Sequence, residues 1–211
     1  MSLNDLKNIT TKDKEEAKNS IYGWITDTIK DINQKIEEIK NIFNKFQEWD
    51  IKNFYKINDT KYRCSTLNSF MLAMTQIGEA WLPIITILLF YQYGNLNVFV
   101  IQKVLWSFAI SGLIAQAIKH LFDRDRPCVV LADAKVVGPA PGSQSFPSGH
   151  TTSAFAICTI FSLILPELTI PMLILAALCG VSRIYLGVHW PSDVIAGMII
   201  GIATSLIVYF F

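Results

Sequence analysis

Five long apolar segments fill the C-terminal two-thirds of the sequence, near residues 68–91, 97–118, 150–165, 169–186 and 193–211. A helix needs about 20 such residues to cross a hydrocarbon core of about 30 Å. The first segment is the weakest, because Gln76 and Glu79 interrupt it, and the third and fourth are short. We therefore predict an all-α fold, an integral-membrane helical bundle of about five transmembrane helices.

The charged residues are concentrated at the other end of the chain. Residues 1–66 hold 12 of the 18 Lys and Arg and 11 of the 17 Asp and Glu, while 52% of all residues are hydrophobic. The net charge of +1 provides no basic field of the kind that binds a phosphate backbone. The composition therefore indicates a membrane protein and excludes nucleic acid as a partner.

Residues 1–60 are predicted to form a polar, amphipathic helical region ahead of a transmembrane domain at 61–211. Its apolar side chains are spaced alternately by four and three residues: Ile25, Ile29, Ile32, Ile36, Ile39, Phe43 and Phe46. Such a stripe can lie in the membrane interface, or it can pair with a second copy as a short coiled coil and give a homodimer. The region cannot span the membrane, because charges recur every few residues.

The loops between the apolar segments are very unequal. Residues 119–149 form a long polar loop, whereas other connections are tight turns. With alternating spans, the segment ends that carry most of the ionisable groups emerge on one face of the membrane, which predicts that function is located there. Glu79 lies within an apolar segment, and we interpret it either as a structural partner for a polar group or as a catalytic acid.

The first motif on that face is Lys119, followed after six residues by Arg126 and Pro127. Fixed Lys and Arg donors can stabilise the negative charge that spreads over a phosphoryl group during its transfer. Basic residues also end many transmembrane helices without any catalytic role, so this motif alone is weak.

The second motif is the segment 146–152, where Pro147, Ser148 and Gly149 lead directly into an apolar helix with His150 in its first turn. Free backbone N–H groups and the positive end of the helix dipole make such a start an anion site.

The third motif runs from Ser182 and Arg183 to His189 and Asp193. Pro191 suits the first turn of a helix, so Asp193 is expected in that turn, four residues beyond His189. From there a carboxylate can reach one imidazole nitrogen, fix the tautomer, and leave the other nitrogen nucleophilic.

In this order and at these span ends, the three motifs resemble the signature of the type-2 phosphatidic acid phosphatase superfamily of lipid phosphate phosphatases. The resemblance covers roughly residues 54–211, and all signature positions match. It implies that His189 attacks phosphorus and becomes phosphohistidine, that Asp193 orients it, and that His150 protonates the leaving oxygen and then activates water. It further implies phosphoryl-binding roles for the following residues: Lys119, Arg126, Ser148, Gly149 and Arg183.

Neighbouring residues of the long loop fall outside the signature. His120, Asp123, Arg124 and Asp125 are expected to shape the loop or the substrate entrance, not to take part in catalysis. No metal and no cofactor are expected, because fixed cations can stabilise the charge that magnesium stabilises in other phosphoryl-transfer sites.

The resemblance to small bacterial members favours a membrane lipid phosphate as substrate, first undecaprenyl diphosphate. Phosphatidate, phosphatidylglycerol phosphate and diacylglycerol pyrophosphate are the alternatives. Other classes are a phosphatase for soluble phosphates, a haloperoxidase-like vanadate binder, and a non-catalytic scaffold that assembles through the N-terminal heptads. Turnover that is lost in His189→Ala would exclude the scaffold.

The same resemblance favours a bacterial cell membrane with the active site outside the cytoplasm. The distribution of Lys and Arg would nominally place that side in the cytoplasm, but catalysis accounts for the cations of the long loop. Cys64 and Cys128 lie on this side of the predicted topology, and a disulfide between them would require an oxidising compartment.

Overall fold

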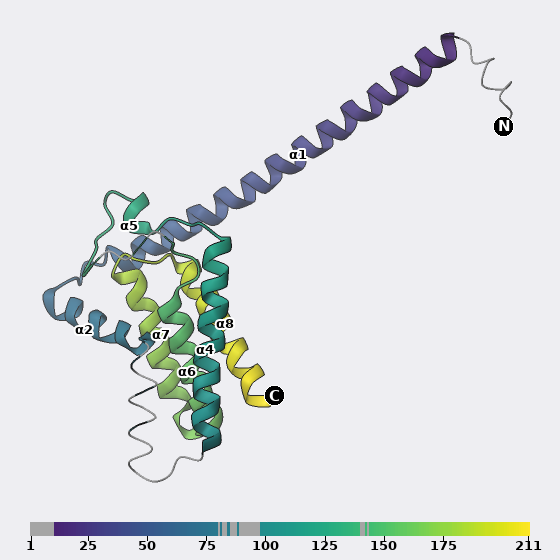
Figure 1. Cartoon of the computed structure of the whole chain (residues 1–211). Coiled ribbons are helices and arrows are strands. Elements are labelled where there is room, and N and C mark those ends of the chain that lie inside the picture. The colour runs from purple at the N-terminus through teal and green to yellow at the C-terminus, as the bar shows by residue number, and fades with distance from the viewer. Residues whose placement is uncertain are drawn as a thin grey trace. The chain divides into compact units, whose positions relative to one another are not determined.

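The computed structural model describes residues 11–79, 81, 84, 88, 98–139, 142 and 144–211. All regular structure in these residues is helical, as predicted for an integral-membrane bundle (Figure 1). The contacts group the chain into two compact units, Met1–Trp49 and Asp50–Phe211, whereas the sequence prediction drew its boundary at residue 60.

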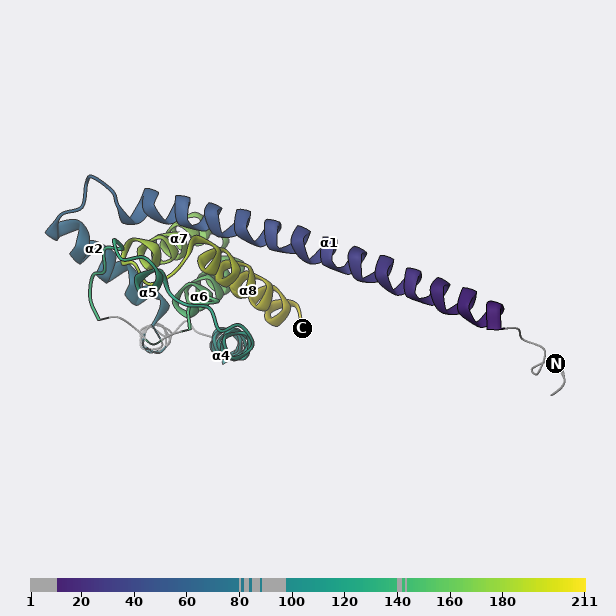
Figure 2. The same ribbon diagram turned by 90° about the horizontal axis from the view of Figure 1, so that it is seen from above.

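Four helices form the bundle of the second unit: α4 (Val98–Leu121), α6 (Gly149–Ile164), α7 (Thr169–Tyr185) and α8 (Pro191–Phe210). The helix α6 packs against each of the other three, and residues 151–162 are buried throughout (Figures 1 and 2). At 16 residues it is only about 24 Å long, but its neighbours enclose it. The bundle is therefore built around its shortest helix.

Small and hydroxylated residues allow α6 and α8 to approach closely. A Cβ atom added at Gly201 would lie 2.5 Å from the backbone oxygen of Thr152. Beside this contact the Ser205 hydroxyl donates to the backbone oxygen of Ala156 at 2.7 Å. Without a hydrophobic driving force in lipid, such close packing and interhelical hydrogen bonds hold transmembrane helices together.

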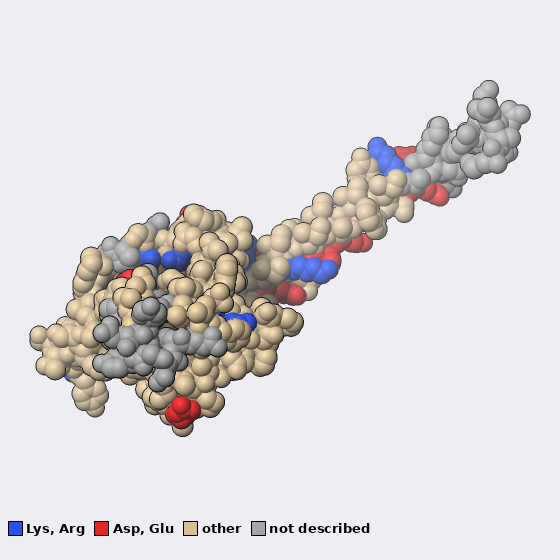
Figure 3. Space-filling view, turned by 60° about the horizontal axis from the view of Figure 1, so that its bottom comes forward, with Lys and Arg blue, Asp and Glu red and all other residues tan. Residues whose placement is uncertain are grey.

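Three helical segments are long and apolar enough to cross a membrane, namely Val98–Leu121, Pro166–Tyr185 and Pro191–Phe210. They match the predicted segments 97–118, 169–186 and 193–211, and the predicted segment 150–165 matches the shorter apolar helix α6. The view of the bundle in Figure 3 shows a surface with few Lys, Arg, Asp or Glu side chains, as a lipid-facing surface requires.

The structure differs from the prediction at residues 68–79, the described start of the predicted segment 68–91. The helix α2 (Ser65–Thr75) runs across the bundle helices, passes into a short 3₁₀ turn, η2 (Gln76–Gly78), and gives way to extended backbone at Glu79 (Figures 1 and 2). A Cβ atom at Gly78 would lie 2.3 Å from the backbone oxygen of His150, so the chain here runs directly over the start of α6. Beyond Glu79, the described residues of the segment are only 81, 84 and 88.

The N-terminal helix α1 (Thr11–Asn58) confirms the predicted amphipathic helix. In the first unit its apolar stripe is exposed, with Ile29 53% and Ile32 50% accessible. From Asp50 onward the helix belongs to the second unit, where Phe54 is buried against Trp190. The membrane-interface and homodimer interpretations of the stripe both stay predictions.

Candidate active site

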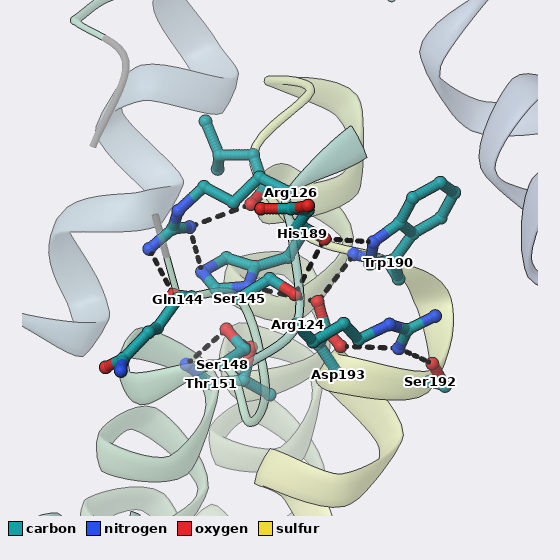
Figure 4. A network of polar contacts seen from close by, with 12 residues as sticks. Arg124, Arg126, Gln144, Ser145, Ser148, Thr151, His189, Trp190, Ser192 and Asp193 are labelled. Atoms are coloured by element: carbon teal, nitrogen blue, oxygen red, sulfur yellow. Dashed lines mark hydrogen bonds and ion pairs between the residues drawn. The ribbon is translucent and has the colours of Figure 1, made fainter. Parts of the chain in front are cut away.

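The three predicted motifs meet at one end of the bundle (Figure 4). The motif residues come from the end of α4, the start of α6, the end of α7 and the turn into α8. Arg126 lies at the junction of the long loop with the short helix α5 (Pro127–Val130), and its Nη1 lies 3.1 Å from His189 Nε2. The Lys119 ammonium nitrogen is 3.7 Å from the point where a Cβ of Gly149 would be.

His189 is buried, with 2% of its surface exposed, and both imidazole nitrogens have partners. A guanidinium group has only donors, so Arg126 donates to Nε2 and leaves the proton of a neutral ring on Nδ1. Nδ1 lies 3.4 Å from Asp193 Oδ2. Burial, followed by the cations Arg183 and Arg126, holds the pKa of His189 well below its ordinary value. The ring is therefore neutral, with the Nε2 lone pair on the side of the cations.

Asp193 is fully buried at the start of α8, and both of its oxygens are engaged. Oδ2 accepts the backbone N–H of Trp190 at 2.9 Å, which caps the helix as Pro191 in the first turn suggested. Oδ1 accepts from Arg124 Nη1 at 2.8 Å. The carboxylate is thus fixed by its own helix on one side and by the long loop on the other.

The segment around Ser148 forms the start of α6. The Ser148 hydroxyl caps the helix. The backbone N–H of Ser148 donates to the backbone oxygen of Asp193 at 3.1 Å, and this bond joins the starts of α6 and α8. N–H groups in the first helical turn lack intrahelical acceptors and suit an anion. The Lys119 ammonium group lies beside Gly149.

His150 faces a residue of the interrupted first segment. Its Nε2 lies 2.7 Å from Glu79 Oε1, and the two side chains are 29% and 40% exposed. Of the two interpretations of Glu79, this contact agrees with a partner for a polar group, and that group is the predicted proton carrier. The end of the helix at Gly78 is what brings this carboxylate to the start of α6.

The two site arginines are held differently. Arg126 donates to backbone oxygens of the loop and turn, with 2.8 Å from Nη1 to Val188 O and 2.8 Å from Nη2 to Gln144 O. Arg183 is 8% exposed and donates from Nη1 to Thr75 Oγ1 at 2.6 Å. Its Nε is buried without a hydrogen-bond partner among the described residues.

Sequence reasoning missed two residues of this network. Arg124 was expected to shape the loop or the substrate entrance, yet it contacts Asp193 directly. Asp50 lies four residues after Phe46, where the apolar stripe of α1 calls for another apolar residue, and its carboxylate binds Arg124. A buried acid at an apolar position is a signal that could have identified Asp50, whereas nothing in the spacing identified Arg124.

The remaining residues of the predicted loop lie outside this network of side-chain contacts. His120 is exposed and approaches Gln116, and Asp125 offers only its backbone oxygen, to the Trp190 indole at 2.8 Å. All four cysteines are free, so Cys64 and Cys128 form no disulfide. In the described part of the chain no group of three or more His, Cys, Asp or Glu side chains is placed to hold a metal ion.

Known proteins resemble this chain in sequence. An undecaprenyl-diphosphatase of Sulfolobus acidocaldarius is 31% identical over 140 residues, 65% of this chain and 66% of that protein. A lipid A 1-phosphatase of Rhizobium johnstonii is 32% identical over 64% of this chain and 63% of its own. The chain thus spans slightly less than two thirds of the length of these two relatives. The undecaprenyl-diphosphatase BcrC of Bacillus subtilis is 27% identical over 75% of this chain and 81% of its own.

Two solved structures share the fold. Aquifex aeolicus LpxE superposes with a TM-score of 0.70 at 26% identity, covering 77% of this chain and 96% of its own. A transmembrane PAP2-type phosphatidylglycerolphosphate phosphatase from Bacillus subtilis gives 0.66 at 28% identity, covering 80% and 86%. The sequence model of the PAP2 superfamily matches residues 101–211, a stretch that contains the three motifs. Because this match covers more than half of the chain, the protein belongs to the PAP2 superfamily.

Proposed function

We propose that the protein is a membrane lipid phosphatase that hydrolyses undecaprenyl diphosphate through a phosphohistidine. The observation that carries this proposal is the state of His189: a buried, neutral imidazole whose Nε2 faces a cationic side chain while Nδ1 faces a carboxylate. A nucleophile that must attack an anionic phosphoryl group needs both an unprotonated nitrogen and cations that attract the phosphate.

In the first step, Nε2 of His189 attacks the terminal phosphorus, and the bond from phosphorus to the bridging oxygen breaks. His150 donates a proton to the leaving undecaprenyl phosphate. Lys119, Arg126 and Arg183 hold the phosphoryl oxygens. Further donors come from the cap of α6, at Ser148 and Gly149.

In the second step, water attacks the phosphorus of the phosphohistidine. His150, which is neutral after the first step, accepts a proton from this water, the P–N bond breaks, and inorganic phosphate leaves. Both histidines return to their starting protonation states, so the net reaction consumes one water for each diphosphate cleaved. No step calls for a metal ion, and activity should therefore persist in EDTA.

The choice of an isoprenoid diphosphate is supported by relatives that bear the name undecaprenyl-diphosphatase, from Sulfolobus acidocaldarius and Bacillus subtilis. The position of the site, at the ends of three helices that can cross a membrane, suits a headgroup whose chain stays in lipid. The second candidate is phosphatidylglycerol phosphate, because a solved relative with a TM-score of 0.66 is a phosphatase named for that lipid.

Phosphate release by the purified protein in detergent with EDTA tests the proposal. The substrates are undecaprenyl diphosphate, phosphatidylglycerol phosphate and phosphatidate, each at the same fraction of the detergent. We expect release that is fastest from undecaprenyl diphosphate, absent in His189→Ala, and unchanged in His120→Ala, an exposed histidine outside the site. Faster release from phosphatidylglycerol phosphate would favour the second candidate, and a strict requirement for magnesium would contradict the mechanism.

We further propose that this end of the bundle faces the outside of a bacterial cell membrane. Cys64 is exposed, and its neighbour Arg63 donates to the backbone oxygen of Tyr185 at the site end of α7, at 2.6 Å. A membrane-impermeant maleimide should therefore label intact cells that express the wild type, and Cys64→Ser should remove most of that label. Labelling only after permeabilisation would place the site in the cytoplasm.

A further inference from the structure

A continuous chain of contacts joins α1 to the proposed nucleophile. It runs from Asp50 of α1 to Arg124 of the long loop, then to Asp193 of α8 and on to His189. We propose that Arg124 is a positioning residue that sets His189 for attack by holding Asp193, and that Asp50 holds Arg124 in turn. This inference rests on the proposed function, because it concerns the same reaction.

Arg124 controls the oxygen of Asp193 that faces away from the imidazole. Oδ2 receives the Trp190 N–H at 2.9 Å and faces His189 Nδ1, so its direction determines where the ring points. Oδ1 is held by Arg124 at 2.8 Å, which prevents the carboxylate from rotating about its last bond. A fully buried carboxylate also needs a cation to balance its charge, and Arg124 is the cation in contact with it.

The contacts of Arg124 depend on the planar shape of its guanidinium group. Nη1 lies between Ser192 Oγ at 2.7 Å and Asp193 Oδ1, while Nη2 donates to Asp50 Oδ2 at 2.5 Å. The group also lies 5.2 Å from the centroid of the Trp190 ring. A planar fork can bridge two carboxylates and stack on an aromatic ring, whereas the compact ammonium group of lysine cannot do both.

Asp50 is the residue of this chain of contacts that lies farthest from His189. It is fully buried and accepts the backbone N–H of Ser192 at 2.9 Å as well as the Ser192 hydroxyl. The Ser192 amide is in the first turn of α8, so Asp50 completes the cap of that helix from a distant part of the sequence. The end of α1 thus helps to fix the same turn that carries Asp193.

The imidazole nitrogen that would attack the phosphoryl group, Nε2, lies on the side of the ring away from Arg124. Arg126 contacts Nε2, and Figure 4 shows Arg124 and Ser192 beyond Asp193, away from Arg126. Because Arg124 acts on Asp193 and not on the substrate oxygens, its loss should slow formation of the P–N bond and leave substrate binding nearly intact. The effect belongs in kcat, not in KM.

The test measures kcat and KM for phosphate release in Arg124→Ala and Arg124→Lys. A misplaced nucleophile costs roughly 100-fold, so we expect kcat to fall by about 10- to 100-fold in Arg124→Ala, with KM changed less than about 3-fold. Lysine should recover only a small part of the rate. Free guanidinium ion added to Arg124→Ala should restore part of it. The control Lys135→Ala removes an exposed cation that pairs with Asp59 and should leave both constants unchanged.

A double mutant separates positioning from a structural role. If Arg124 acts through Asp193, then Arg124→Ala should cost less than about 3-fold when Asp193→Asn is already present. A full additional loss in the double mutant, or equal losses in kcat and affinity, would overturn the proposal. Asp50→Asn preserves side-chain shape, and it replaces Arg124→Ala in the test if that variant does not fold. We expect Asp50→Asn to lower kcat several-fold at constant KM.

The outcomes also distinguish this inference from the proposed function. A wild type that releases phosphate from none of the three lipids would reject the proposed function, and the positioning role with it. A wild type that is active while Arg124→Ala and Asp50→Asn match its kcat would overturn only the positioning role. Melting temperature and elution in detergent show in each case that the variant is folded.

Discussion

The helix α1 places one apolar pattern in two different environments. Up to Phe46 its stripe is exposed, whereas Asp50, the next position in the same spacing, and Phe54, one turn further, are both fully buried in the second unit. Helical periodicity shows which face is apolar, but it does not show what covers that face. The difference shows that the residues at the end of α1 pack with the second unit, while the preceding stripe is available for another surface.

The sharpest contrast between the two regions should appear in catalysis. Removal of the nucleophile in His189→Ala should lower the rate of phosphate release by about 10⁵-fold or more, as loss of a nucleophile does in other covalent mechanisms. Ile32→Ala in the exposed stripe should stay within about 2-fold of the wild type. Comparable losses in both variants would break the assignment of catalysis to the second unit.

Asp193→Asn should have the next largest effect. The asparagine side chain keeps the shape of the group but loses the charge that orients the imidazole, and about 10²- to 10³-fold loss of kcat is expected. Measurable activity should remain, because Nε2 and the cations near it are still present. A loss as large as that of His189→Ala, measured by phosphate release, would contradict a purely orienting role.

Glycine substitutions compare the packing of the two regions. Gly201→Ala would put a methyl group 2.5 Å from the Thr152 backbone oxygen, and such overpacking should destabilise the bundle by about 1–3 kcal/mol. Gly23 in α1 has nothing within 4 Å of the same position, so Gly23→Ala should stabilise its helix by about 0.5–1 kcal/mol. Thermal unfolding measured by circular dichroism in detergent checks both, and equal effects would refute the contrast.

The stability of the second unit should depend on pH through His189. The pKa of His189 is lowered on folding, mainly by burial, so the unfolded chain binds a proton that the folded protein rejects. The stability that this neutral ring contributes is present above about pH 6.5 and is lost as pH falls, by about 1 kcal/mol per pH unit. His189→Asn should make the melting temperature change less between pH 6.5 and 5.5, whereas His120→Ala should leave that change as it is in the wild type.

Much of the architecture could be predicted, because hydropathy and motif spacing are local properties. Four of the five apolar segments coincide with helices, and the three motifs meet at one end of the bundle. The break at Gly78 could not be predicted, since its cause is the close passage of His150 from a distant part of the chain. A backbone contact of this kind leaves no periodic trace in the sequence.

The network around Asp193 escaped prediction for a related reason. An arginine two residues before Arg126 looks like any other cation of a polar loop, and only the fold brings it to Asp193. Asp50 lies in a helix that its composition assigns to the polar, amphipathic region ahead of the transmembrane domain. Contacts between residues far apart in the chain, such as Asp50 with Ser192, depend on tertiary packing and not on local pattern.

Direct detection of the phosphoenzyme tests the central claim of this account. Protein incubated briefly with undecaprenyl diphosphate labelled in its terminal phosphate, and then quenched in base, should carry label that is stable to alkali and labile to acid. Mass spectrometry should place it on His189, and His189→Ala should carry no label. Label on another residue, or phosphate release by His189→Ala at the wild-type rate, would contradict the account.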